Sequence, residues 1–258
     1  MTSAAGSPIE TARANRAMLG LRGRGAIITG ASHGIGRETA LRLAAAGAVV
    51  VATGRDEPAL RSLAIEAECT GGVIHPHRAD LTDQADRDRL SAAARRQVGL
   101  VSILVHSAGV HRRDPLAHAP VAHLDEQFAV NVRAPYALTQ TLLPDLIAAH
   151  GDVVFINSTQ GLSAAAGVGQ YAATKHALRA VADALRAEIA DTGVRVCSIF
   201  PGRTATPMQE QIFRDEGRPW NPDLLVHPRD IANLVVAAVA LPAGTEISEV
   251  VIRPARKL

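Results

Sequence analysis

The protein has 258 residues, of which 47% are hydrophobic and 3% aromatic, and its formal net charge at pH 7 is +2. This length allows one large buried core, and the balanced charge without a basic cluster argues against a nucleic-acid partner. Its two cysteines, Cys69 and Cys197, provide neither a disulfide framework nor a metal-ligand spacing, which indicates a reducing cytoplasm and no metal site.

The hydrophobic segments do not indicate a membrane protein. Glu10, Arg13 and Arg16 interrupt the N-terminal region where a signal peptide would have a continuous apolar core. The longest late apolar run, residues 234–241, is too short to cross a bilayer. We therefore expect a cytoplasmic protein without a membrane partner.

The chain begins with an Ala-rich arm, residues 1–23, in which we expect at most one weak helix over 10–18 and no chemistry. From residue 24 onwards, short apolar runs of strand character alternate with amphipathic helical patterns. The expected strands cover 25–30, 48–53, 73–77, 101–106, 152–157, 194–200 and 249–253, and the expected helices cover 37–47, 58–68, 83–97, 124–149, 171–191 and 229–241. Pro135 lies inside the longest helix and should bend or break it.

This alternation predicts a single α/β domain, residues 24–258, in which a doubly wound parallel sheet of the Rossmann type has helices on both faces. Residues 203–228 break the pattern with polar and proline-containing sequence. An irregular segment of this kind is a candidate for a mobile lid over a substrate.

The stretch from Ser158 to Lys175 is the candidate for catalysis. Ser158 ends an apolar strand, which places its hydroxyl at the carboxyl end of the sheet, where open α/β sheets bind ligands. Tyr171 and Lys175 are four residues apart, so on a helix they share one face, and a nearby ammonium lowers the pKa of a phenol. Tyr171 is therefore the proposed acid/base. The alternative is an exposed pair in which the lysine stem lies over the tyrosine ring.

A glycine-rich turn is the second motif. Residues 29–36, TGASHGIG, connect the first expected strand to the first expected helix. Glycines permit a tight turn and let the backbone approach a pyrophosphate, whose charge the helix N-terminus would stabilise. The spacing differs from GxGxxG and lacks the Lys-Ser/Thr pair of a P-loop, which argues against an ATPase.

Together these motifs resemble the short-chain dehydrogenase/reductase family over residues 25–254. Asn131, Ser158, Tyr171 and Lys175 are similar to its catalytic tetrad, in the expected order. The residues that the resemblance assigns to cofactor binding are Gly30, Ser32, His33, Gly34, Ile35, Gly36, Arg55, Asp80, Leu81, Ala108, Gly109, Asn131, Tyr171, Lys175, Pro201, Gly202, Thr204 and Thr206.

The resemblance implies an NAD(P)-dependent oxidoreductase that transfers a hydride between a nicotinamide and a carbonyl or secondary alcohol of a small molecule. Ser158 would hydrogen-bond the carbonyl oxygen, and Tyr171 would donate the proton. Lys175 would hold the nicotinamide ribose and lower the pKa of the phenol. Asn131 would support a water leading to Lys175, and Asp80 would contact the adenine. Related proteins commonly pair through the helices expected at 124–149 and 171–191, so we expect a homodimer or homotetramer.

NADP(H) is expected to be preferred, with NAD(H) possible. Gly54 is placed where NAD-dependent members usually have Asp, and Arg55 can bind a 2′-phosphate through two hydrogen bonds. His33 would add a donor. The alternative is that Arg55 pairs with Asp56 or Glu57 in solvent.

Two segments depart from the family pattern. His106-Ser107-Ala108-Gly109 replaces Asn-Asn-Ala-Gly after the fourth strand, so we expect some loss of sheet support but an intact site. The C-terminal segment lacks the Gly-Gln and Asp-Gly-Gly pattern of ketoacyl reductases, which argues against a fatty-acid role.

Two further functions stay open. One is a non-catalytic NADP-binding regulatory protein of the same fold, against which the complete tetrad argues. The other is an epimerase or dehydratase, against which the glycine spacing and the modest length argue. His33, His106 and His111 are expected to be structural or surface residues rather than metal ligands.

Overall fold

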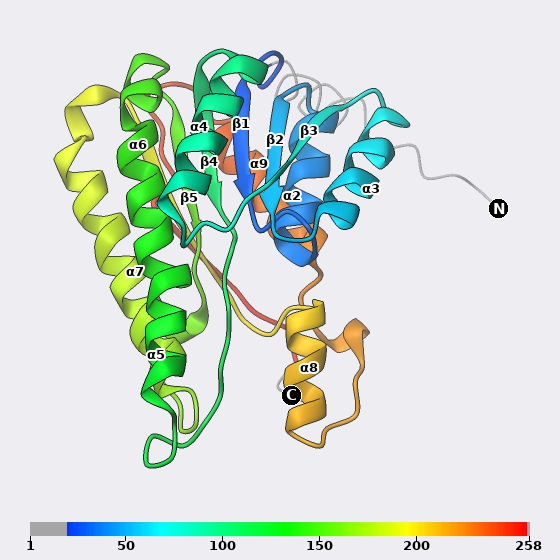
Figure 1. Ribbon diagram of the computed structural model, residues 1–258, viewed down its shortest axis with the longest axis vertical. Coiled ribbons are helices and arrows are strands. Elements are labelled where there is room, and N and C mark those ends of the chain that lie inside the picture. The colour runs from blue at the N-terminus through cyan, green and yellow to red at the C-terminus, as the bar shows by residue number, and fades with distance from the viewer. Residues whose placement is uncertain (1–19, 257–258) are drawn as a thin grey trace.

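A parallel sheet in the order β3-β2-β1-β4-β5-β6-β7 forms the centre of the molecule (Figure 1). The computed structural model describes residues 20–256. The strands are β1 Gly25–Thr29, β2 Val49–Gly54, β3 Val73–Arg78, β4 Val101–His106, β5 Asp152–Ile156, β6 Arg195–Pro201 and β7 Glu249–Ile252. Each predicted strand is present, with its ends displaced by at most one residue.

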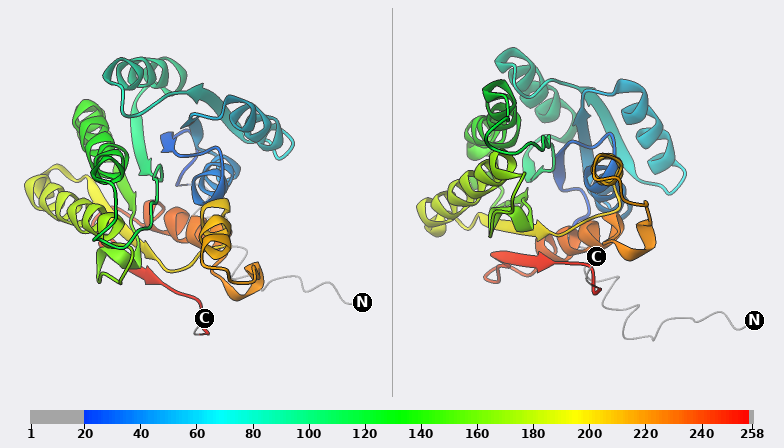
Figure 2. Two further views of the ribbon diagram at one scale, coloured as in Figure 1. Left: turned by 60° about the horizontal axis from the view of Figure 1, so that its bottom comes forward. Right: turned by 90° about the horizontal axis from the view of Figure 1, so that it is seen from below.

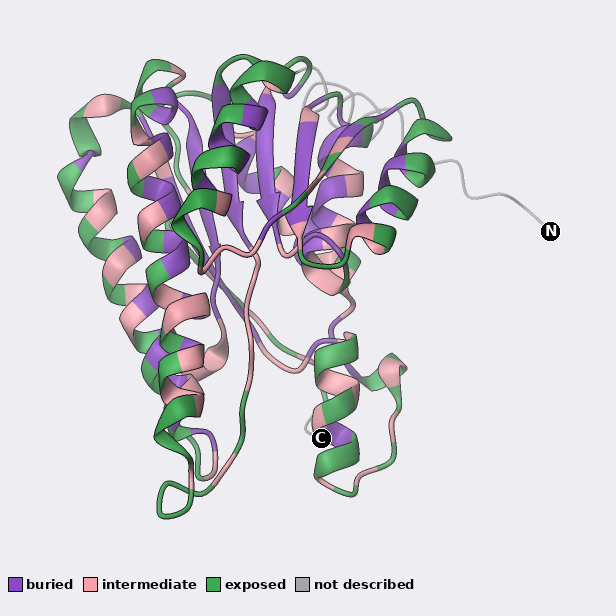
Figure 3. Ribbon diagram, in the orientation of Figure 1, coloured by how far each residue is buried: buried purple, intermediate pink, exposed green. Residues whose placement is uncertain are grey.

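Helices cover both faces of this sheet, as Figure 2 shows. They are α2 Gly34–Ala45, α3 Glu57–Glu68, α4 Gln84–Val98, α5 Val121–Phe128, α6 Ala134–Ala148, α7 Gly169–Glu188, α8 Pro207–Asp215 and α9 Pro228–Val239. Successive strand side chains point to opposite faces, so Ile28 packs with α2, α3 and α9, whereas Ile27 packs with α4, α6 and α7. The five inner strands, β1, β2, β4, β5 and β6, are accordingly almost entirely buried (Figure 3), whereas the edge strands β3 and β7 are partly exposed. The predicted doubly wound α/β fold is confirmed.

The strand order reverses between β1 and β4, which lie side by side. The chain leaves these two strands toward opposite edges, and the crevice at such a switch point is where open α/β sheets bind ligands. Gly30 follows β1 with a φ of +65°, and a Cβ on it would lie only 2.7 Å from Ala108 Cα in the loop after β4. Glycine is therefore required where the two loops meet.

The packed domain includes part of the predicted arm. Leu21 is fully buried in the core, and Gly23 N donates a hydrogen bond to Gly47 O at 2.8 Å. The weak helix predicted over 10–18 lies outside the described residues.

The long helix predicted over 124–149 is divided. A π-helical turn, Ala129–Arg133, separates α5 from α6. Pro135 has no N–H to donate to the carbonyl one turn earlier, at Asn131, and π-turns interrupt α-helices at such positions. The interruption was predicted at Pro135 but lies on its N-terminal side.

The predicted lid, residues 203–228, contains α8 and a short turn of 3₁₀ helix, Pro222–Leu224. A bridge between Thr204 and Val226 closes its base. Figure 1 shows α8 below the carboxyl ends of the strands. Within residues 20–256, no helix has the length and apolar character to cross a bilayer.

Candidate active site

A cleft of about 550 Å³ opens at the carboxyl ends of the strands. The predicted cofactor residues that line it are Gly30, Ser32, His33, Gly34, Ile35, Arg55, Asp80, Leu81, Ala108, Gly109, Tyr171, Lys175 and Thr206. A second cavity of about 230 Å³ adjoins it and is lined by Ser158, Pro201, Gly202 and Thr204. The structure therefore brings most of the predicted residues to the first cleft and separates Pro201, Gly202 and Thr204 from it.

The glycine turn has features that fit a diphosphate. His33 is the N-cap residue of α2, and its side chain accepts no hydrogen bond from the first backbone amides of the helix. These amides are therefore available to an anion. A Cβ on Gly36 would collide with the carbonyl of Gly30, so the close turn requires glycine although Gly36 itself does not line the cleft. The hydroxyl of Ser32 is buried and has no hydrogen-bond partner among the described residues. A phosphate oxygen would satisfy this group.

Asp80 also lines this cleft, and its carboxylate is held by hydrogen bonds. Its Oδ1 accepts hydrogen bonds from Thr82 N at 2.9 Å and Thr82 Oγ1 at 2.7 Å. These two bonds lower the pKa of Asp80, so it is an ionised acceptor at neutral pH. An acceptor in this position fits the amino group of an adenine.

Tyr171 lines both cavities, whereas Lys175 lines only the first and Ser158 only the second. Ser158 follows β5, and its Oγ accepts a hydrogen bond from Gln160 N at 3.1 Å. Lys175 Nζ donates to Ile156 O at 3.0 Å and lies 5.7 Å from the centre of the Tyr171 ring. Three groups from β5 and α7 therefore meet where the cavities join, and the alternative of an exposed Tyr–Lys surface pair does not apply because Lys175 is buried.

The predicted lowering of the phenol pKa is wrong for this geometry. Burial raises the pKa of Tyr171 to about 12, and a hydrogen bond with Ser158 only partly opposes this rise. Burial also lowers the pKa of Lys175 to about 8. Both shifts have one cause, because a low-dielectric environment disfavours phenolate and ammonium alike.

Asn131 is buried in the π-helical turn and does not line either cavity. Its Oδ1 accepts from Val110 N at 2.8 Å, and its Nδ2 donates to Val110 O at 2.9 Å and to Thr174 Oγ1 at 3.1 Å. The amide of Asn131 therefore holds the loop after β4 against α7.

Asn157 is a positioning residue that the sequence reading did not identify. Its Oδ1 accepts from Ser158 N at 2.8 Å, and its Nδ2 donates to Lys175 O at 3.1 Å. A Cβ on Gly161 would lie 2.5 Å from Asn157 Oδ1, so a glycine is needed beside this amide. The local sequence signal for this role is an Asn immediately before Ser158, the candidate catalytic residue.

The expected loss of sheet support at His106 and Ser107 is not found. His106 is buried, stacks on Phe155 and contacts Thr139 Oγ1 through Nε2 at 2.8 Å. Since Thr139 Oγ1 donates its proton to Pro135 O, Nε2 of His106 is the donor. Burial lowers the pKa of His106 to about 3, so the ring is neutral and structural, as predicted.

Three residues of the second cavity were also missed as site residues: His111, Arg113 and Arg203. His111 contacts the ring of Tyr171 edge-on, with centroids 4.6 Å apart. Mainly through burial, the pKa of His111 is lowered to about 4, so this ring is neutral at pH 7. The structure thus places a neutral His111 ring beside the candidate phenol of Tyr171.

The sequence model of the short chain dehydrogenases matches residues 24–217. The protein therefore belongs to the short-chain dehydrogenase/reductase family and is an oxidoreductase.

Similar proteins have diverse activities. The 1-deoxy-11-beta-hydroxypentalenate dehydrogenase of Streptomyces exfoliatus is 36% identical over 85% of this chain and 80% of its own. A glycine betaine reductase of Emericella nidulans is 32% identical over 91% of this chain, which spans only 19% of that protein. The crystal structure of a metagenomic short-chain oxidoreductase in complex with NADP is 31% identical, with a TM-score of 0.80 over 92% of this chain and 100% of that one.

Proposed function

We propose that the protein is an NADP(H)-dependent reductase of carbonyl groups in small molecules. The observation that supports this most directly is the position of Tyr171, which lies between a cleft that fits a dinucleotide and a smaller cavity that contains Ser158. The adjacent Lys175 lies on the dinucleotide side. In this arrangement Tyr171, as the proton donor, lies between the cavity for the cofactor and the cavity for the substrate.

A bound nicotinamide cofactor would supply the hydride. The glycine turn and the N-terminus of α2 would hold the diphosphate, and Lys175 the nicotinamide ribose. Ser158 and Tyr171 would hydrogen-bond the carbonyl oxygen, and Tyr171 would transfer its proton to that oxygen. Asn131 and Asn157 would keep the two walls of the site in register.

The raised pKa of Tyr171 suits its phenol to act as the proton donor in carbonyl reduction at neutral pH. A phenol with a pKa of about 12 keeps its proton at pH 7 and can donate it. The reverse reaction requires phenolate, which is scarce at that pH.

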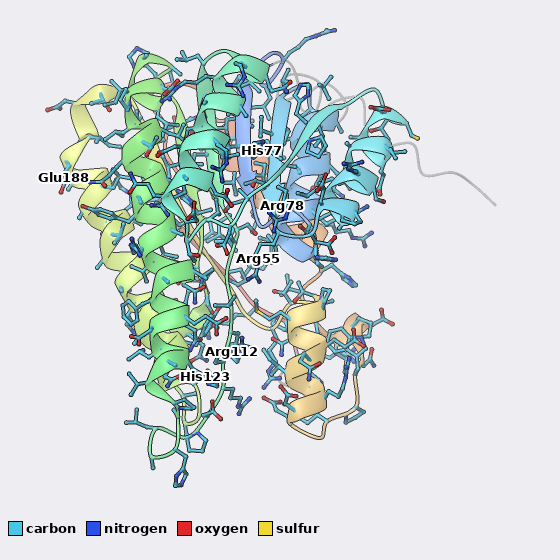
Figure 4. The ribbon with its side chains drawn as sticks, viewed as in Figure 1. Arg55, His77, Arg78, Arg112, His123 and Glu188 are labelled. Carbon is cyan, nitrogen blue, oxygen red and sulfur yellow. The ribbon has the colours of Figure 1, made fainter. Side chains whose placement is uncertain are left out.

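The surroundings of Arg55 support a preference for NADP(H). Asp56 caps α3 by accepting from Ala59 N, and Glu57 pairs with Arg61 at 2.6 Å. Arg55 has no ion-pair partner among residues 20–256, lines the cleft and lies below the strands in Figure 4. The alternative in which Arg55 pairs with Asp56 or Glu57 is not found, so its guanidinium is available for a 2′-phosphate.

We further propose a cytoplasmic protein that forms homo-oligomers. The location rests on the two cysteines, which are both free thiols. Self-association rests on exposed apolar side chains of α5 and α6, namely Phe128, Tyr136 and Ile147.

The test is NADPH oxidation with a panel of aldehydes and ketones, measured for the wild type and for Tyr171→Phe. The phenylalanine keeps the ring but has no proton to donate, so turnover should fall at least about a hundredfold while NADPH binding is unchanged. A variant that retains more than about a third of the activity would contradict the role of Tyr171. NADPH binding without turnover of any carbonyl would favour the non-catalytic regulatory protein.

A further inference from the structure

The described side chains that line the second cavity include basic residues but no acidic ones. The lining of this cavity includes Ser158 and Tyr171, which carry hydroxyls, and the two basic residues Arg113 and Arg203. Among the described residues that line it, none is Asp or Glu. Two guanidinium groups in a cavity of about 230 Å³ without an acidic residue favour an anionic occupant.

The chain presents Arg113 to this cavity by a specific arrangement of the loop after β4. Gln127 Oε1 accepts a hydrogen bond from Arg112 N at 3.0 Å, and Asn131 binds both backbone groups of Val110. With this backbone fixed, His111 and Arg113 line the cavity. The side chain of Arg112 instead pairs with Glu126 at 2.9 Å, and Figure 4 shows it in the long loop leading to α5.

Arg203 lies at the start of the lid and also lines this cavity. Its Nη1 and Nη2 donate to the two carboxylate oxygens of Glu216 at 3.0 and 2.8 Å. Arg113 also donates to Glu216 through Nη1, and Arg218 contacts it at 3.4 Å. Glu216 thereby links the lid to the loop after β4.

One carboxylate cannot neutralise three guanidinium groups. Glu216 is an ionised partner, because its bonds to Arg203 and Arg113 outweigh burial and lower its pKa. Glu216 does not line the cavity. Asp215, which also acts on His111 electrostatically, does not line it either. Arg113 Nε and Nη2 have no hydrogen-bond partner within residues 20–256, so they can donate to a ligand.

We propose that the substrate of this enzyme is a carbonyl compound with a carboxylate, which Arg113 and Arg203 bind while the carbonyl oxygen meets Ser158 and Tyr171. The proposal rests on the proposed reductase function and adds the chemical class of the substrate. Arginine suits this role because its planar fork matches the two oxygens of a carboxylate.

The first experiment compares keto acids with primary amides of the same size and shape. The pairs are phenylglyoxylate with phenylglyoxylamide and 4-oxopentanoate with 4-oxopentanamide, each assayed by NADPH oxidation. We expect kcat/KM to be at least about tenfold higher for the acid in each pair, the size of one charge-assisted hydrogen bond. Equal kcat/KM values for acid and amide would overturn the proposal and leave the reductase function intact.

The variants Arg113→Gln and Arg203→Gln should each lower the acid-to-amide ratio of kcat/KM about tenfold to a hundredfold, mostly through KM. Arg112→Gln is the matched control, because its guanidinium pairs with Glu126 and does not line the cavity. It should leave the ratio unchanged. If an arginine variant fails to fold, the acid-to-amide ratio of kcat/KM for the wild type is by itself the test of the proposal.

A binding experiment separates this proposal from the proposed function. Benzoate and benzamide are titrated calorimetrically into the wild type in the presence of NADP⁺. Tighter binding of benzoate, weakened by Arg113→Gln, would support the anion site even if no carbonyl were reduced, in which case the reductase function alone would fail. Benzoate binding no tighter than benzamide would overturn the anion site whatever the turnover.

Discussion

The half-buried Tyr171 lies at the junction of the two cavities, and its pKa of about 12 predicts how the rates of carbonyl reduction and alcohol oxidation depend on pH. Alcohol oxidation needs phenolate, whose fraction rises about tenfold per pH unit below the pKa. Oxidation should therefore accelerate steadily from neutral to alkaline pH. Carbonyl reduction should stay level up to about pH 8, the pKa of Lys175, and fall as this ammonium loses its proton.

Initial rates with one ketone and its alcohol, measured at saturating substrate across this range, test the assignment. An oxidation rate that reached its plateau below pH 8 would show that the phenol ionises more easily than burial allows.

Arg55 is the side chain on which the cofactor preference depends. Replacing it with Ala should weaken NADPH binding about tenfold to a hundredfold, the effect of losing one charge-assisted phosphate contact. NADH binding should barely change. The control is Arg61→Ala, because Arg61 pairs with Glu57 on the exposed side of α3. Calorimetric titration of both cofactors measures the effect, and equal losses for NADH and NADPH would contradict it.

A substitution at Gly54 also tests the preference for NADPH over NADH, by adding a negative charge. An Asp there would repel a 2′-phosphate and accept hydrogen bonds from ribose hydroxyls, so Gly54→Asp should flatten or invert the preference. A Cβ at this position also contacts Ser32 Oγ, which must rotate. Gly54→Ala introduces the same Cβ without the charge and is the control. If the alanine changes the NADPH-to-NADH ratio as much as the aspartate does, sterics and not charge decide it.

The junction of β5 with α7 depends on Asn157, whose amide links Ser158 to the backbone of Lys175. Asn157→Ala would leave Ser158 N and Lys175 O without these partners, and should lower the free energy of unfolding by about 1–3 kcal/mol. Turnover should fall as well, because both catalytic groups lose a common support. Denaturant unfolding and kcat measure the two effects. Asn157→Asp keeps the acceptor for Ser158 N, so its turnover should fall less than that of the alanine variant. An unchanged free energy of unfolding for Asn157→Ala would refute the role of Asn157 in holding Ser158 and Lys175 together.

The whole molecule is expected to self-associate through α5, α6 and α7. Light scattering at micromolar concentration should give two or four times 27.0 kDa. Tyr136, about half exposed on α6, is suited to a test, because Tyr136→Asp would place a charge in an apolar contact and shift the mass toward the monomer. Leu116→Asp changes an exposed leucine in the loop after β4 and should leave the mass unaltered. A wild-type mass of 27.0 kDa would contradict self-association.

The strands and most of the helices could be predicted from the sequence, because the underlying signals are local, whereas α8 lies in a segment that was expected to be irregular. Period-2 and period-3.6 patterns depend on near neighbours, and they identified every strand to within one residue. The glycine turn and the four-residue spacing of Tyr171 and Lys175 are likewise local, and the structure places both at the same cleft.

Burial and the meeting of distant segments were decided only by the tertiary structure. The pKa of Tyr171 rises because other elements exclude water from it, which no spacing within α7 encodes. Leu21 enters the core, and Arg113 and Arg203 reach one cavity, because the sheet brings distant parts of the chain together. Secondary structure follows from short-range backbone geometry, whereas electrostatics and substrate shape depend on which remote side chains become neighbours.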